Sequence, residues 1–114
     1  MSVSYFVRYD IRSRDLPAFL SRYREEHVRV LSSWPGLQRV LLHTAAEWID
    51  PSPVNRGTSV LLAQMEFDSV ESLNRALGSP QRAEARRDFE RFPPFEGTVT
   101  HQAMQTTEAW RRPQ

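Results

Sequence analysis

The 114-residue sequence predicts an α+β domain in which helices cover one face of an antiparallel sheet. Three observations support this prediction: stretches of alternating side chains, stretches with apolar residues three and four apart, and capping residues, Pro or Gly at the junctions. In chain order these stretches are strand, helix, strand, strand, helix, strand. That order is the ferredoxin-like βαββαβ arrangement, with both helices on one face of the sheet.

The first half of the chain contains a strand, a long helix and a second extended run. Side chains alternate over residues 3–9, which predicts a strand. Asp15 is an N-cap candidate for a helix that continues to about Ser33 and is ended by Pro35-Gly36. Residues 37–48 form the second extended run. The apolar stripe of the helix contains Leu16, Leu20, Tyr23, His27, Val30 and Trp34.

The second half contains a loop, a strand, two short helices and a last strand. Residues 50–57 are polar and broken by prolines, and their length favours a mobile flap over a tight hairpin. Residues 59–67 and 97–107 have strand patterns. Asp68 with Glu71 forms a capping box for the first short helix, which Gly78 ends, and Ser79-Pro80 opens the second, which ends before Pro93.

Composition places the chain among ordinary globular domains. We expect one domain over residues 1–108 and a C-terminal tail over 109–114. The chain has no cysteine, and its 15 basic and 14 acidic residues are mixed, so neither a thiolate site nor a nucleic-acid partner is expected. The arginines of residues 82–91 are interpreted as a solvated helix face. No membrane span or secretory signal is evident, so a cytoplasmic protein is expected.

The predicted strands carry apolar side chains on both faces, although helices can cover only one. The other face therefore needs a cover, and a second copy of the chain is the simplest one. The expected assembly is an isologous homodimer packed sheet to sheet.

His27 is the strongest candidate for a catalytic residue, because it is a titratable side chain on the apolar stripe of the long helix. Burial would lower its pKa and leave a neutral imidazole that can act as a general acid or base. A structural histidine, satisfied by a backbone carbonyl or by Asp88, is the alternative. Asp88 and Tyr23 are the groups expected to assist proton transfer.

Aromatic and methionine side chains predict a site for a flat apolar ligand. His43 and His101 lie on strands and could also point inward, but with His27 they form no compact metal-ligand motif, and no metal is expected. No phosphate-binding loop or serine nucleophile elbow is present, so neither a nucleotide-dependent nor an acyl-enzyme mechanism is expected. The leading hypothesis involves no cofactor. The expected substrate-binding residues are Tyr5, Trp34, His43, Trp48, Met65 and Phe67.

An ordered set of residues resembles the EthD-like proteins of the dimeric α+β barrel superfamily. The set comprises Tyr23, Glu26-His27, Trp34-Pro35-Gly36-Leu37, Phe67-Asp68-Ser69, Ala76-Leu77, Ser79-Pro80, Asp88 and Phe92. The resemblance implies a homodimer with a pocket between sheet and helices in each half. The helix histidine of the family falls on His27 and its later acidic residue on Asp88, whereas Arg29 stands where a small residue or proline is common.

The resemblance implies several chemistries, because one fold hosts many functions. The leading hypothesis is a protein that binds a hydrophobic or aromatic small molecule and acts as a cofactor-free isomerase, lyase or monooxygenase in aromatic or ether catabolism. The alternative is a non-catalytic ligand-binding or accessory protein for an oxidoreductase system. A third possibility, haem binding through His27 or His43, would give a coloured protein.

Overall fold

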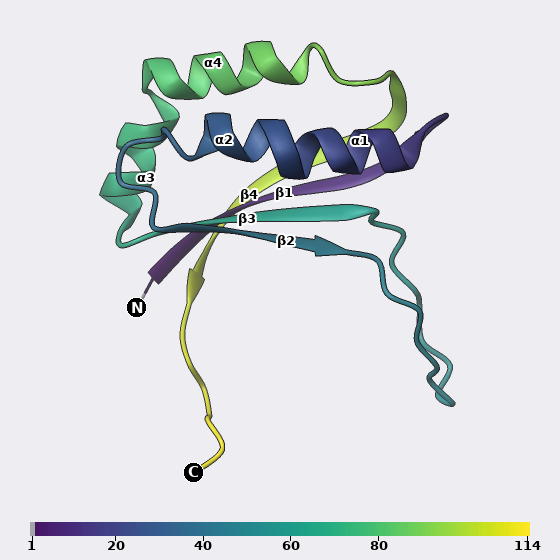
Figure 1. Cartoon of the computed structure of the whole chain (residues 1–114). Helices are drawn as coiled ribbons and strands as arrows, with labels where there is room; N and C mark the ends of the chain where they lie inside the picture. The colour runs from purple at the N-terminus through teal and green to yellow at the C-terminus, as the bar shows by residue number, and fades with distance from the viewer. Residues whose placement is uncertain (1) are drawn as a thin grey trace.

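The computed structural model describes residues 2–114 and confirms the predicted ferredoxin-like fold. Four antiparallel strands form one sheet in the order β2-β3-β1-β4, and the helices lie on one face of it (Figure 1). In chain order the elements are β1 (Ser2–Ser13), α1 (Leu16–Arg22), the π-helical turn η1 (Tyr23–His27), α2 (Val28–Leu31), β2 (Arg39–Thr44), β3 (Leu61–Phe67), α3 (Val70–Leu77), α4 (Pro80–Phe89) and β4 (Phe95–Thr106).

The long helix begins as predicted but contains a π-helical turn. The Ala18 amide donates to the Asp15 carboxylate at 3.0 Å, so Asp15 is the N-cap. The buried residues follow a spacing of four, which in a regular α-helix rotates the face by about 40° per step. The wider π turn of η1 offsets that rotation and keeps Tyr23 and His27 facing the sheet. The residues buried at this spacing are Phe19, Tyr23, His27 and Leu31.

The helix ends at Pro35-Gly36, as the sequence predicts. Gly36 has a φ of 78°, a conformation that a residue with a Cβ rarely adopts. A Cβ at this position would also lie 2.3 Å from the Ser72 hydroxyl oxygen. The positive φ is what requires glycine in the turn between α2 and β2, since the Ser72 hydroxyl could rotate away from an added Cβ.

The caps of the two short helices differ in how well the sequence predicts them. The N-cap of α3 is Ser69, whose hydroxyl accepts from the Ser72 amide at 3.1 Å, so the predicted capping box headed by Asp68 is wrong. Ser79 caps α4 as predicted, with Pro80 in its first turn.

The core lies between the sheet and the helices. Alternate side chains of β1 and β3 face the helices and are buried, whereas the other face of the sheet has no helix over it. That open face is mixed rather than apolar: Phe6, for example, lies opposite Gln64 on one side and Gln102 on the other. The expectation of apolar side chains on both faces is therefore only partly right. The apolar members of the open face are Phe6, Leu41, Leu62 and Met104.

Two arms leave the body of the protein. β2 ends at Thr44 and β3 begins at Leu61, so the predicted strands are too long here and residues 45–60 form the first arm. Residues 107–114 form the second. Both extend on the side of the sheet opposite the helices (Figure 1). Within residues 2–114, no helix has the length and apolar character needed to cross a membrane.

Candidate functional site

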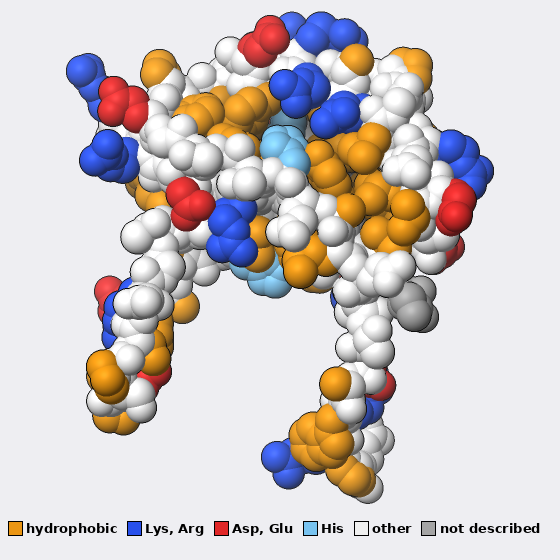
Figure 2. All heavy atoms as spheres, turned by 180° about the vertical axis from the view of Figure 1, so that it is seen from behind, with side chains coloured by type: hydrophobic (Ala, Val, Ile, Leu, Met, Phe, Trp, Pro, Cys, Tyr) orange, Lys and Arg blue, Asp and Glu red, His pale blue; other side chains and the backbone are white. Residues whose placement is uncertain are grey.

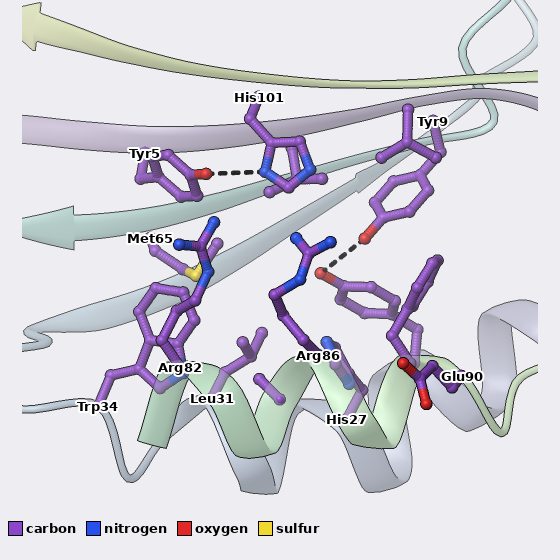
Figure 3. A pocket seen from close by; sticks show the side chains of 15 residues that line it. Tyr5, Tyr9, His27, Leu31, Trp34, Met65, Arg82, Arg86, Glu90 and His101 are labelled. Carbon is purple, nitrogen blue, oxygen red and sulfur yellow. Dashed lines mark hydrogen bonds between the residues drawn. The ribbon is translucent and has the colours of Figure 1, made fainter. Parts of the chain in front are cut away.

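A cavity of about 360 Å³ lies between the helix layer and the helix-facing side of the sheet. Its walls come from every layer of the fold: β1, β3 and β4 on one side, and the long helix and α4 on the other (Figure 3). Aromatic and aliphatic side chains form most of the wall, with titratable groups among them. The lining residues are Tyr5, Val7, Tyr9, Tyr23, His27, Leu31, Trp34, Met65, Arg82, Ala85, Arg86, Phe89, Glu90, Val99 and His101.

His27 enters the cavity wall from η1 with a fixed orientation. Its Nδ1 lies 2.8 Å from Asp88 Oδ2, and the other Asp88 oxygen accepts from the Arg22 guanidinium at 3.1 Å. Arg22 also pairs with Glu26 at 2.8 Å. Because an ionised carboxylate can only accept, Nδ1 carries the hydrogen and Nε2 carries the lone pair.

The environment keeps the His27 imidazole neutral. Burial lowers the pKa of His27 below its usual value of 6.5, although the hydrogen bond and the charge of Asp88 act in the opposite direction. The ring is only 5% exposed and packs between Tyr23, at 4.8 Å between ring centroids, and Phe92, at 5.2 Å. A neutral imidazole with a carboxylate behind it has the arrangement of a general base.

Tyr23 is a hydrogen-bond donor rather than a second base. The Tyr9 hydroxyl donates to the Tyr23 oxygen at 3.4 Å, which leaves the Tyr23 hydrogen free for another acceptor. Burial holds the pKa of Tyr23 well above its usual value of 10.0 and raises that of Tyr9 to about 12. Both phenols therefore keep their protons, and Tyr23 can donate to an oxygen that gains negative charge in the cavity.

A second cluster of polar side chains lies in the cavity between β4 and α4. The Tyr5 hydroxyl lies 2.7 Å from His101 Nδ1, and Arg82 and Arg86 reach toward this pair from α4 (Figure 3). In Figure 2 a histidine lies in a hollow bordered by hydrophobic side chains, with basic groups on the rim. Every basic residue other than histidine in this chain is an arginine.

Sequence reasoning missed the two arginines by assigning them to a solvated face. The available signal was their spacing, because Arg82, Ala85, Arg86 and Phe89 are three or four apart and share one stripe of α4. The strand pattern allows His101 to point inward, and its pairing with Val7 of β1 places it on the helix-facing side.

The structure brings together most of the predicted site residues. Tyr5, Trp34 and Met65 line the cavity beside His27 and Tyr23, while Asp88 stands behind His27. Three other residues expected to bind substrate lie outside the cavity, each for a different physical reason.

His43, Trp48 and Phe67 do not reach the cavity. His43 points to the open face of the sheet, where Nε2 lies 3.0 Å from the Gln64 side-chain oxygen. Trp48 belongs to the first arm, where the Arg56 guanidinium lies 4.0 Å from the centre of its ring. Phe67 faces the helices but is wholly buried beneath α3, at the far end of β3.

The three histidines do not converge. His27 and His101 line the cavity, whereas His43 lies on the opposite side of the sheet. In the described part of the chain, no cluster of three or more His, Asp or Glu side chains could hold a metal ion.

Comparison with known proteins gives structural relatives only. No family model and no curated protein sequence matches the chain. An EthD family protein from Bacillus halodurans superposes with a TM-score of 0.72 at 22% identity, over 94% of this chain and 100% of that one. The chain therefore has the fold of an EthD family protein.

Two more distant structures share the EthD-like fold. One is a dimeric protein of unknown function with a ferredoxin-like fold from Bacteroides fragilis, with a TM-score of 0.60 and 12% identity over 92% of this chain and 96% of that one. The other is SnoaB, a cofactor-independent oxygenase from Streptomyces nogalater, with a TM-score of 0.60 and 13% identity over 95% of each chain. The resemblance expected from the sequence is thus confirmed at the level of the fold.

Proposed function

We propose that this protein is a small-molecule enzyme that uses His27 as a general base on a hydrophobic, aromatic substrate, without a cofactor. The observation that supports this most is that His27, bonded to Asp88 at 2.8 Å, also lines an aromatic-walled cavity, which a purely structural histidine would not need to do. Isomerase, lyase and monooxygenase reactions of carbon acids and phenols share this first proton transfer. Substrates from aromatic or ether degradation fit such a cavity.

The chain's own residues account for one proton transfer. His27 Nε2 takes a proton from an acidic C–H or O–H bond of the substrate, and the bonding electrons remain on the substrate as an enolate or phenolate. Asp88 stabilises the imidazolium that forms. The Tyr23 hydroxyl can donate a hydrogen bond to the substrate oxygen that becomes negative, and the apolar wall strengthens that bond by excluding water.

Two of the structural relatives support the proposal, which is itself based on the geometry of the site. SnoaB, with this fold, is a cofactor-independent oxygenase. The Bacteroides fragilis protein is dimeric, and we include a homodimer in the proposal for this chain.

The base is tested by deuterium exchange at the benzylic carbon next to the carbonyl of 2-tetralone, followed by NMR in D2O. This ketone is a flat aromatic carbon acid whose exchange needs only a base. We expect the wild-type protein to accelerate exchange and His27→Ala to lower the rate by about 100-fold, the lower range for a positioned general base. Added imidazole, which fits the space that the substitution leaves, should restore part of the rate.

His43→Ala is the matched control, because His43 lies on the open face of the sheet. It should exchange 2-tetralone at the wild-type rate. Equal rates for wild type and His27→Ala would contradict the proposed base. Binding of 2-tetralone with no accelerated exchange would instead favour the alternative, a non-catalytic ligand-binding or accessory protein, for which the apolar wall is enough.

A further inference from the structure

Arg82 and Arg86 are two positive charges in the cavity wall that make no ion pair with a carboxylate. The Arg82 guanidinium donates to the Leu77 carbonyl oxygen at 3.4 Å, and within residues 2–114 no acidic group lies within ion-pair distance of either guanidinium. Glu90 lines the same cavity but is not paired with them. By contrast, Arg22 of the long helix is paired twice, with Glu26 and Asp88.

The sheet side of the cavity does not supply the missing negative charge. The titratable side chains that face the arginines from the sheet are Tyr5 and His101, which are hydrogen-bonded to each other at 2.7 Å. Burial lowers the pKa of His101, and Arg82 and Arg86 lower it further, so this imidazole is neutral. Burial also raises the pKa of Tyr5 against the pull of the same arginines, so the phenol keeps its proton. The pair offers hydrogen bonds but no charge.

The two arginines act as a pair because of their place on α4. They are four residues apart, which puts both on the face of α4 that covers the cavity, and Figure 3 shows both side chains extending from that helix toward the sheet. Arg82 is half-buried, so its charge is less screened by water than that of a surface arginine. Planar guanidinium groups match the geometry of a carboxylate and can bind it through two parallel hydrogen bonds.

We infer that the cavity takes a planar aromatic compound that carries a carboxylate, which Arg82 and Arg86 hold while the aromatic body lies against the apolar walls. The inference concerns the same site as the proposed function and specifies its substrate class. It places the anionic group at the end of the cavity formed by α4 and β4, so that the rest of the ligand extends toward His27 on the long helix.

Two probes of nearly equal shape test this assignment by calorimetry: 2-naphthoate, which carries a carboxylate, and 2-naphthamide, which is neutral. We expect the wild-type protein to bind 2-naphthoate about tenfold more tightly, a difference of about 1.4 kcal/mol. Higher ionic strength should weaken binding of 2-naphthoate and leave 2-naphthamide unchanged, because salt screens only the charged ligand.

The double variant Arg82→Gln/Arg86→Gln should lose the preference and bind both probes with similar affinity. Arg87→Gln/Arg91→Gln is the matched control, since it also removes two positive charges, at exposed residues in and just after α4 that do not line the cavity. It should keep the tenfold preference. A circular dichroism melt confirms that each variant is folded.

Equal affinity of the wild-type protein for the two probes would overturn the inference, as would an unchanged preference in the double variant or failure of both probes to bind. None of these results bears on exchange of 2-tetralone, which carries no charge. If the wild-type protein does not accelerate exchange of 2-tetralone, its preference for 2-naphthoate would still stand. The two proposals can therefore fail separately.

Discussion

Two opposing influences act on the His27 imidazole, and the stronger one, burial, keeps it neutral. Burial lowers its pKa, and the Asp88 carboxylate partly offsets this, with the net pKa below 6.5. The imidazole is therefore predominantly in its neutral, proton-accepting form at neutral pH, and the base is lost as the pH falls through this lowered pKa. The unfolded chain binds the proton more readily than the folded chain, so stability also declines as the pH falls below about 6.5.

The pKa values of Tyr5, Tyr9 and Tyr23 are shifted in the opposite direction from that of His27. Burial raises all three pKa values above 10.0, that of Tyr9 to about 12. We predict that at pH 10.0 the folded protein contains much less tyrosinate than the chain unfolded in denaturant, as measured by ultraviolet difference absorbance. Because the folded-state pKa values are the higher ones, stability is lost as the pH rises from 10 toward 12.

The denaturant-unfolded protein at the same pH is the control, since its tyrosines have ordinary pKa values. If the folded protein has half of its tyrosines ionised at pH 10.0 while its circular dichroism spectrum is unchanged, the tyrosines are not buried as the structure places them. Tyr23 would then be unable to act as the proposed proton-retaining donor.

At the scale of elements, the long helix shows what a periodic pattern can and cannot predict. The helix, its Asp15 cap and its end at Pro35-Gly36 all follow from local chemistry, and all are confirmed. The π turn does not, because its cause is tertiary: four bulky side chains spaced by four must all face one sheet. That turn sets the direction in which the His27 side chain points, so the orientation of the proposed base depends on tertiary packing.

The start of α3 provides a direct test of a helix cap. Ser69 accepts from the Ser72 amide, whereas Asp68 is exposed and makes no cap. Ser69→Ala should lower the free energy of unfolding by about 1 kcal/mol, because an amide of the first turn loses its acceptor. Asp68→Ala, the matched control, should change it by less than about 0.5 kcal/mol.

Urea unfolding followed by circular dichroism measures both variants, at one protein concentration so that any association is constant. The reverse order of effects, with Asp68→Ala the more damaging, would restore the capping box that the sequence suggests. Asp68 and Ser69 are neighbours with similar cap propensities, so the sequence alone does not distinguish them.

At the scale of the whole molecule, strand order and strand faces are predictable, whereas strand ends are not. The alternation of β1 and β3 places Tyr5 and Met65 correctly in the cavity wall. His43 and Trp48 are misplaced because β2 has apolar residues on both faces and stops at Thr44, so alternation could not choose its inner face or locate its end.

The arms and the open face of the sheet are the surfaces that a second copy would cover. The arms carry large apolar side chains into solvent, with Ile49 96% and Trp110 72% exposed. Figure 2 shows hydrophobic groups on both of them. A second copy seated against the open face would cover these side chains together with Phe6 and Leu62.

We predict that light scattering after size-exclusion chromatography gives the mass of a dimer for the wild-type protein and of a monomer for Leu62→Arg. Leu62 lies on the open face of β3, so a charge there would be buried without a partner in the dimer, while in the monomer it remains in water. Ala83→Arg adds the same charge on the exposed side of α4 and should remain dimeric. A monomeric wild type, or a dimeric Leu62→Arg with unchanged circular dichroism, would show that this face is not the interface and would leave the arms to another partner.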